Sequence, residues 1–183
     1  MKLKILTLSF LLAGLSMGCT EPPKGITPIS QFDIKRYQGK WYEIMRLDHR
    51  FERGLSNVTA TYTPQENGSI EVVNRGLDQE SCKWKEAKGT ATFLGAKTIA
   101  SLSVTFFWPF SGGYHVMALD KKHYQYALVS GPSRDYLWIL ARNASLKPKI
   151  KKKLISIAQQ NGFNTRELIL VNQAKSFCDK KTS

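Results

Sequence analysis

An all-β fold is what the sequence predicts: an eight-stranded antiparallel up-and-down barrel, with one C-terminal α-helix packed outside and a short ninth strand. Short runs of alternating apolar and polar residues follow one another between residues 41 and 142, without a helical pattern and with loops of hairpin length. Short loops pair each strand with its neighbour in the chain. Eight such strands close into a barrel that has no free edge and holds one small ligand inside.

The first strand begins at the triplet Gly39-Lys40-Trp41. Gly39 lets the backbone turn sharply into the strand, and Trp41 places a large apolar ring at its start, where it can close one end of the barrel. Asn67-Gly68 is a strong hairpin signal between the second and third strands, because both residues accept positive φ. The seven further strands are expected over residues 58–63, 70–74, 88–94, 100–108, 114–119, 124–130 and 136–142.

Two segments have helical rather than strand character. Residues 33–37 can form one helical turn with Asp33 as its N-cap. Residues 148–160 begin with a proline, stop at Asn161-Gly162 and carry an apolar stripe at helical spacing. The stripe consists of Ile150, Leu154, Ile157 and Ala158. We expect this helix to pack on the barrel wall and residues 167–171 to form the short ninth strand.

The N-terminal segment has the features of an export signal. Lysines 2 and 4 precede an apolar run, and small residues stand before Cys19. A cysteine directly after Gly18 resembles the bacterial lipoprotein signal, and Thr20 after it favours the outer membrane. We therefore expect a signal peptide over 1–18 and lipidation of Cys19. Residues 19–31, rich in proline and polar residues, are expected to be the lipidated tether, 32–178 the barrel domain and 179–183 a tail.

Charge and compartment limit the partners of the protein. The formal net charge is +13, which suits nucleic acid or an anionic lipid surface, and export disfavours nucleic acid. The lysines of residues 147–153 form either a solvated helix face or a contact for anionic head groups. Cysteines pair in an oxidising compartment. If Cys19 carries lipid, Cys82 and Cys178 remain and allow one disulfide.

Several motifs resemble the lipocalin family. Residues 136–143 are similar to its third conserved region, in which the arginine at the strand end packs over the tryptophan of the first strand, here Arg142 over Trp41. The second region is matched more loosely by residues 119–129, where Leu119 replaces a threonine. Residues 42–54 and 106–114 resemble the bacterial outer-membrane lipoprotein lipocalins, the subgroup related to apolipoprotein D.

This resemblance implies a ligand inside the barrel, a floor made by Trp41 and Arg142, and a disulfide between Cys82 and Cys178. Counting by two from Trp41 and Arg142 then predicts the inward-facing residues of each strand. The expected ligand contacts are Glu43, Met45, Ala60, Tyr62, Asn74, Phe93, Val104, Phe106, Tyr114, Val116, Trp138 and Leu140. This lining is mostly apolar with a few polar groups, which suits an acyl chain with a polar end.

The function expected from these features is a membrane-anchored carrier or store of fatty acids or lysophospholipids, without a cofactor or a metal. An esterase is disfavoured, because no G-x-S-x-G elbow occurs and the three histidines lack metal-ligand spacing. A closed barrel with a structural role stays open, although small residues at 60, 89, 91 and 118 favour space inside. The aromatic loop 107–110 could touch a membrane or a second subunit, so a homodimer also stays open.

Overall fold

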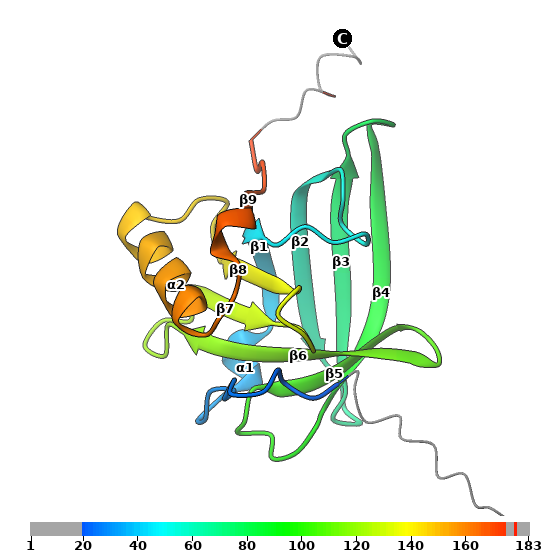
Figure 1. Cartoon of the computed structure of the whole chain (residues 1–183). Helices are drawn as coiled ribbons and strands as arrows, with labels where there is room; N and C mark the ends of the chain where they lie inside the picture. Colours follow the sequence, from blue (N-terminus) through cyan, green and yellow to red (C-terminus); the bar gives the residue numbers. More distant parts are fainter. Residues whose placement is uncertain (1–19, 175–177, 179–183) are drawn as a thin grey trace, which may run out of the picture.

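The computed structural model describes residues 20–174 and 178, and its ring of eight antiparallel strands confirms the predicted barrel (Figure 1). Each strand pairs with its neighbour in the chain, as short loops require. The long strands β2 to β4 run side by side, and the helix α2 lies on the other side of the barrel. The strands of the ring are β1 (Gly39–Arg46), β2 (Leu55–Pro64), β3 (Ile70–Asp78), β4 (Lys83–Phe93), β5 (Ser101–Phe107), β6 (Phe110–Leu119), β7 (Tyr126–Ser130) and β8 (Leu137–Ala141).

Strand β1 closes the ring because it pairs on both sides. Its residues 39–42 lie opposite residues 59–62 of β2, and its residues 42–46 lie opposite residues 138–141 of β8. The first half of β1 therefore pairs with β2, and the second half pairs with β8 but not with β2.

The C-terminal segment fills the gap where β1 and β2 diverge. Strand β9 (Ile169–Leu170) pairs with Met45 and Arg46 outside the ring, after the short 3₁₀ helix η1 (Thr165–Glu167). The side-chain amide of Gln173 then donates to the carbonyl oxygens of Glu43 at 2.7 Å and of Val58 at 2.9 Å. The expected ninth strand is confirmed, although Glu167, its first expected residue, belongs to η1.

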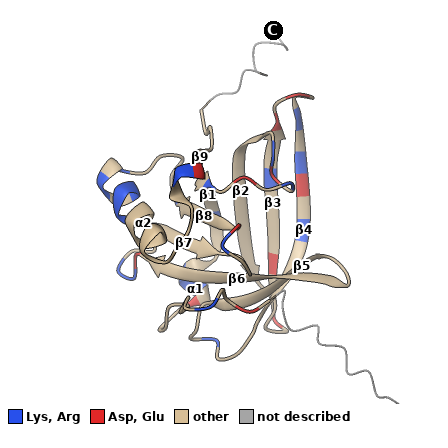
Figure 2. Ribbon diagram, viewed as in Figure 1, with Lys and Arg blue, Asp and Glu red and all other residues tan. Residues whose placement is uncertain are grey.

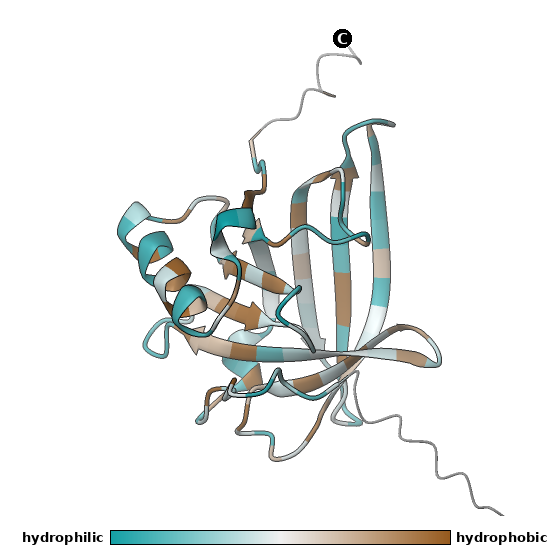
Figure 3. Ribbon diagram, in the orientation of Figure 1, coloured by the Kyte–Doolittle hydropathy of each residue, from teal (hydrophilic) through white to brown (hydrophobic). Residues whose placement is uncertain are grey.

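Helix α2 (Pro148–Gln160) packs its apolar stripe on the outside of the barrel. Leu154 and Ala158 are fully buried, in a cluster that we call the helix-side cluster. The barrel residues of this cluster include Ile44, Leu128, Leu137, Ile139 and Ala141. The basic and hydrophilic residues of α2 lie on its outer side (Figures 2 and 3). Among the described residues, no helix is long and apolar enough to span a membrane.

One end of the barrel is covered by α1 (Ile34–Tyr37), and we call it the floor. The Asp33 side chain accepts from the Lys35 amide at 2.9 Å, which is the predicted N-cap. Trp41 is fully buried there and donates its Nε1 hydrogen to the carbonyl oxygen of Tyr37 at 2.8 Å. The Arg142 guanidinium lies 4.0 Å from the centroid of the Trp41 ring, a cation–π contact.

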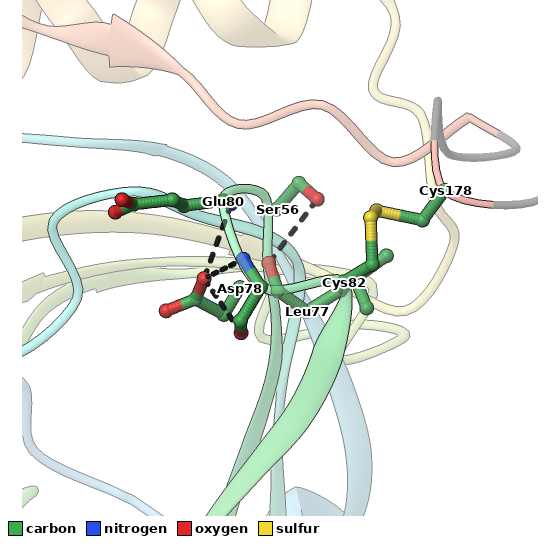
Figure 4. The surroundings of a disulfide bond; sticks show 7 residues. Ser56, Leu77, Asp78, Glu80, Cys82 and Cys178 are labelled. Atoms are coloured by element: carbon green, nitrogen blue, oxygen red, sulfur yellow. Dashed lines mark hydrogen bonds between the residues drawn. A yellow bond between two sulfur atoms is a disulfide. The ribbon is translucent and has the colours of Figure 1, made fainter. Parts of the chain in front are cut away.

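The other end, which we call the mouth, is formed by the loops 47–54, 79–82, 108–109 and 131–136. A disulfide joins Cys82 in one of these loops to Cys178, across 96 residues of sequence (Figure 4). Asp78 accepts from the amides of Glu80 and Ser81 in the same turn and pairs with Lys85. The hydrogen bond from Lys85, followed by those from the amide and the hydroxyl of Ser81, holds the pKa of Asp78 well below its usual range.

Most of residues 20–31, part of the expected tether, lie along the barrel wall beneath β5 and β6, and in this they differ from a free linker (Figure 1). The Ile29 amide donates to Val116 at 2.9 Å, and Ser30 forms a bridge with Ile99. Ile26 is buried in the helix-side cluster. The apolar Ile26 and Ile29 explain the difference, because leaving them in water would forgo the free energy of burying them. Cys19 lies outside the described residues.

Candidate ligand-binding site in the barrel interior

Most residues expected to face inward lie in one apolar cluster inside the barrel, which we call the inner cluster. Asn74 lies directly opposite Ala60, a member of the cluster, and therefore shares its face. The structure brings to this cluster Ala60, Tyr62, Phe93, Val104, Phe106, Tyr114, Val116, Trp138 and Leu140, together with Trp41 of the floor. Their role as ligand contacts remains a prediction.

The expected inward orientation of Met45 was wrong. The register between β1 and β8 shifts between Glu43 and Met45, so that Glu43 lies opposite Leu140 while Met45 lies opposite Ile139. Ile139 belongs to the helix-side cluster, and Met45 packs against that cluster as well. A β-bulge inserts one extra residue into a strand, so the residues after it change faces. Arg46 is consequently the residue that follows Glu43 on the inner face.

The small residues at 118 and 89 leave less space inside the barrel than the sequence suggests. A second register shift, between Val116 and Ala118, places Ala118 in the helix-side cluster. A Cβ atom at Gly89 would lie 2.7 Å from the Phe106 ring, so Phe106 already fills the space beside this glycine. Solvent nevertheless reaches the interior, because Asn74, Val104, Phe106, Tyr114 and Trp138 on the inner face are only half-buried.

A group of charged and polar side chains lies inside the barrel toward the mouth, and we call it the mouth cluster. Arg46 donates from Nη1 to Oε1 of Glu43 at 2.8 Å and from Nη2 to the carbonyl oxygen of Glu52 at 2.7 Å. Oε2 of Glu52 lies 3.1 Å from Nε2 of His49 and accepts from Nε1 of Trp138 at 3.1 Å. One arginine thus faces two carboxylates in a site where Arg46 is only 2% exposed and Glu43 only 3%.

The two carboxylates of the mouth cluster have opposite pKa shifts. Burial raises the pKa of Glu43 well above its usual value, and the charge of Glu52 adds to this, against the opposing effect of Arg46. Burial also acts to raise the pKa of Glu52. Four interactions outweigh this effect of burial and lower the pKa of Glu52. They are the hydrogen bond and the charge of His49, the hydrogen bond from Trp138 and the charge of Arg46. Glu52 is therefore the carboxylate that stays ionised beside Arg46.

Three tyrosine hydroxyls meet inside the barrel near the floor. The Tyr114 hydroxyl lies 2.7 Å from that of Tyr37 and accepts from that of Tyr62 at 2.9 Å. Burial raises the pKa of all three phenols above the usual value, so they remain neutral. The interior therefore has a neutral polar group near the floor, a charged group toward the mouth and apolar side chains around both.

The sequence reasoning missed Arg46 and Glu52 as interior residues. Strict alternation from Trp41 assigns Arg46 to the outer face, and Glu52 lies in a loop where alternation says nothing. The available signal was chemical, because an arginine three residues after an inward-facing glutamate offers the partner that a buried carboxylate needs. His49 lies in the same loop as Glu52 and contacts it.

Other parts of the described structure do not form a comparable site. A groove of about 620 Å³ is lined mainly by polar residues of β3 to β5 such as Glu71, Lys88, Thr90 and Thr105, and Gly89 and Phe106 also border it. His115 faces outward, 3.0 Å from Oγ of Ser101, while His123 is exposed. Within residues 20–174 and 178, no group of three His, Cys, Asp or Glu side chains could hold a metal ion.

The family of the chain follows from comparison with known proteins. The profile of the lipocalin-like domain matches residues 32–173. The chain belongs to the lipocalin family. It is 47% identical over 166 residues to the outer membrane lipoprotein Blc of Escherichia coli strain K12, covering 90% of this chain and 93% of that protein. It is 34% identical over 163 residues to apolipoprotein D of Bos taurus, covering 85% and 82% of the two chains.

Solved structures agree with this lipocalin in fold. Insecticyanin from the tobacco hornworm Manduca sexta has a TM-score of 0.67 at 19% identity, covering 88% of this chain and 93% of that one. The resemblance read from the sequence is thereby confirmed. Lipocalins are in general binding proteins for small hydrophobic molecules, and the interior of this lipocalin has the apolar wall that such a molecule needs.

Proposed function

We propose that this lipocalin stores or transports fatty acids or lysophospholipids in the barrel interior while anchored to the outer membrane through lipidated Cys19. The observation that supports it best is the mouth cluster, which places a buried arginine at one end of an interior with a mostly apolar wall. Fatty acids and lysophospholipids have the matching shape, with one acyl chain and one polar head.

The acyl chain would lie along the half-buried inner residues. Val104, Phe106 and Tyr114 come from the neighbouring strands β5 and β6 and retain solvent exposure on the inner face. An acyl chain that covers them removes apolar surface from water, which contributes about 0.8 kcal/mol for each buried methylene. This burial is the main source of affinity in the proposal.

The head group would meet the mouth cluster. Nε of Arg46 is buried without a hydrogen-bond partner and lies 4.0 Å from Oε2 of Glu52. An unpaired buried donor is costly, and a carboxylate or phosphate oxygen is a strong acceptor for a guanidinium. Arg50 of the loop 47–54 is exposed at the same end and suits an anionic head, whereas Arg53 of this loop is paired with Asp48 at 2.8 Å.

Anchoring is supported by the relatives rather than by the described residues. The Blc proteins of Escherichia coli and of Vibrio cholerae, the latter 47% identical over 156 residues, are named outer membrane lipoproteins. The pattern of residues 1–19 agrees with such processing. The barrel would then face the periplasm, the oxidising compartment in which its disulfide forms.

The proposal is tested by filling the interior with a larger side chain. Ala87 lies directly opposite Asn74 on the inner face, and its neighbour Lys88 faces outward. We expect Ala87→Phe to abolish saturable binding of oleate and of lysophosphatidylcholine to the delipidated protein in calorimetry, and Lys88→Phe to leave it unchanged. Equal binding by both folded variants, or none by the parent, would instead favour a closed barrel, for which the tight packing of Phe106 on Gly89 is the present argument.

A further inference from the structure

Aromatic side chains are exposed together at the tip of the hairpin between β5 and β6. Phe107 is 70% exposed, Trp108 88% and Phe110 77%, and Phe51 in another mouth loop is 60% exposed. None of these rings takes part in the inner cluster. Contiguous exposed aromatic residues of this size mark contact with a partner or a membrane rather than ordinary surface.

The N-terminal end of the described chain is fixed close to this hairpin. A Cβ atom at Gly113 would lie only 2.6 Å from the carbonyl oxygen of Thr20, so Thr20 is pressed against the outer face of β6. Gly113 follows Phe110 by three residues, or about 10 Å along a strand. The fully buried His115 lies beside the same segment. Burial lowers the pKa of its imidazole, and the backbones of Glu21 and Thr20 partly oppose this shift.

The segment after Thr20 holds this position along the wall. Nη2 of Arg134, in a mouth loop, donates to the carbonyl oxygen of Lys24 at 2.8 Å. Ile26 is buried, and the Ile29 amide donates to Val116. The chain therefore leaves the barrel beside the hairpin at a defined place. Cys19 directly precedes Thr20 in the sequence.

We propose that the hairpin tip of β5 and β6 rests in the bilayer that holds the anchor, with Phe107, Trp108 and Phe110 among the lipids and the mouth of the barrel turned toward the membrane surface. An acyl anchor on Cys19 leaves almost no spacer between the bilayer and the wall of β6, so the hairpin beside that wall must come close to the lipids. Aromatic rings are favourable in the interfacial region of a bilayer.

Charge at the mouth agrees with a lipid surface as the partner. Arg50 lies 4.8 Å above the Phe51 ring, and Lys83 is exposed at the start of β4. Cations beside exposed aromatic rings suit phosphate head groups above an apolar layer. The inference rests on the anchoring proposed above and adds an orientation, in which a lipid ligand passes between the membrane and the mouth without crossing open water.

The test uses the full chain, processed by the cell and reconstituted into vesicles of phosphatidylglycerol and phosphatidylcholine with brominated acyl chains. Bromine quenches a tryptophan that it touches. We expect quenching of the parent protein and less quenching of Trp108→Phe. Leu94 is 40% exposed at the floor end, so the double variant Leu94→Trp/Trp108→Phe is the matched control and should not regain the lost quenching.

Flotation of the same vesicles separates the two claims. If the protein floats but Trp108→Phe is quenched as strongly as the parent, or if Leu94→Trp restores quenching, the orientation is overturned and the anchoring stands. If the protein does not float, both are overturned. If Trp108 is unquenched and Trp108→Phe turns a cross-linkable dimer into a monomer, the hairpin binds a second copy of the chain instead.

Discussion

Arg46 donates a hydrogen bond to Glu43 inside the barrel, 2.8 Å from Nη1 to Oε1, although the two residues are three positions apart on one strand. In a regular strand these residues would face opposite sides of the sheet. The register shift between Glu43 and Met45 turns both to the inside. The bulge therefore places Arg46 beside Glu43 and Glu52, two interior carboxylates that strict alternation would leave without this cation.

Glu43→Gln tests which carboxylate of the mouth cluster is ionised. Burial raises the pKa of Glu43 in the folded protein above its value of about 4.5 in the unfolded chain. The protonated side chain therefore contributes its full stabilisation of the folded state below pH 4.5, and this stabilisation is lost as the pH rises through the folded-state pKa. A neutral Glu43 is mimicked by glutamine, and we expect the free energy of unfolding at pH 7 to change by less than about 1 kcal/mol. Urea unfolding across pH 4–8 measures this.

Glu52→Gln is the matched control for that prediction. The pKa of Glu52 is lowered, so its contribution to stability is present above the unfolded value and is lost as the pH falls through the folded pKa. Removing this charge leaves Arg46 uncompensated, and we expect a loss of about 3 kcal/mol at pH 7. A large loss from Glu43→Gln with a small one from Glu52→Gln would reverse the assignment.

Arg142→Lys tests the closure of the floor. Arg142 donates to the carbonyl oxygens of Lys40 at 2.9 Å and of Arg36 at 2.9 Å while it covers Trp41. Lysine keeps the charge but not the planar fork, and we expect it to lower the free energy of unfolding by about 2–3 kcal/mol. Arg36 contacts Tyr124 and donates to the carbonyl oxygens of Lys121 and Lys122 at the exposed surface, so Arg36→Lys should cost less than about 1 kcal/mol. Equal losses in thermal unfolding would remove the special role of Arg142.

The double variant Cys82→Ser/Cys178→Ser tests the tie between the mouth and the C-terminal segment. The disulfide spans 96 residues, and the chain-entropy model gives about 4–5 kcal/mol as the upper stabilisation from such a loop. We expect the urea midpoint to fall in the variant. Dithiothreitol should lower the midpoint of the parent to the same value and leave the variant unchanged. A reductant that shifts neither protein would contradict the prediction.

Alternation and loop length were sufficient to predict the ring of strands, because each strand is local and its pairing follows from short connections. They failed where the chain departs from period two, at the bulges after Glu43 and after Val116. The first half of β4 was missed as well, because Lys83, Lys85 and Glu86 are exposed and show no apolar signal, as the mixed charges along β4 illustrate (Figure 2).

Contacts between distant segments were equally hidden. The packing of Ile26 and Ile29 on the barrel depends on where α2 and β6 lie, which a proline-rich stretch does not reveal. The same holds for the side chain of Gln173, which joins β1 to β2 from the end of the chain. For the site, the alternation of residues along the strands was enough to predict the apolar wall. The mouth cluster could not be predicted in this way, because the bulge after Glu43 turns Arg46 to the inner face.

The central claim, that a lipid lies in the barrel interior, is tested most directly by titrating the delipidated protein with a fatty acid brominated in its acyl chain. Trp138 lies on the inner face, and Trp84 lies on the outside beneath Arg75, 3.9 Å from its ring centroid. We predict saturable quenching in the parent and in Trp84→Phe, and its loss in Trp138→Phe. Unchanged quenching in Trp138→Phe, or quenching that disappears with Trp84, would contradict an interior site.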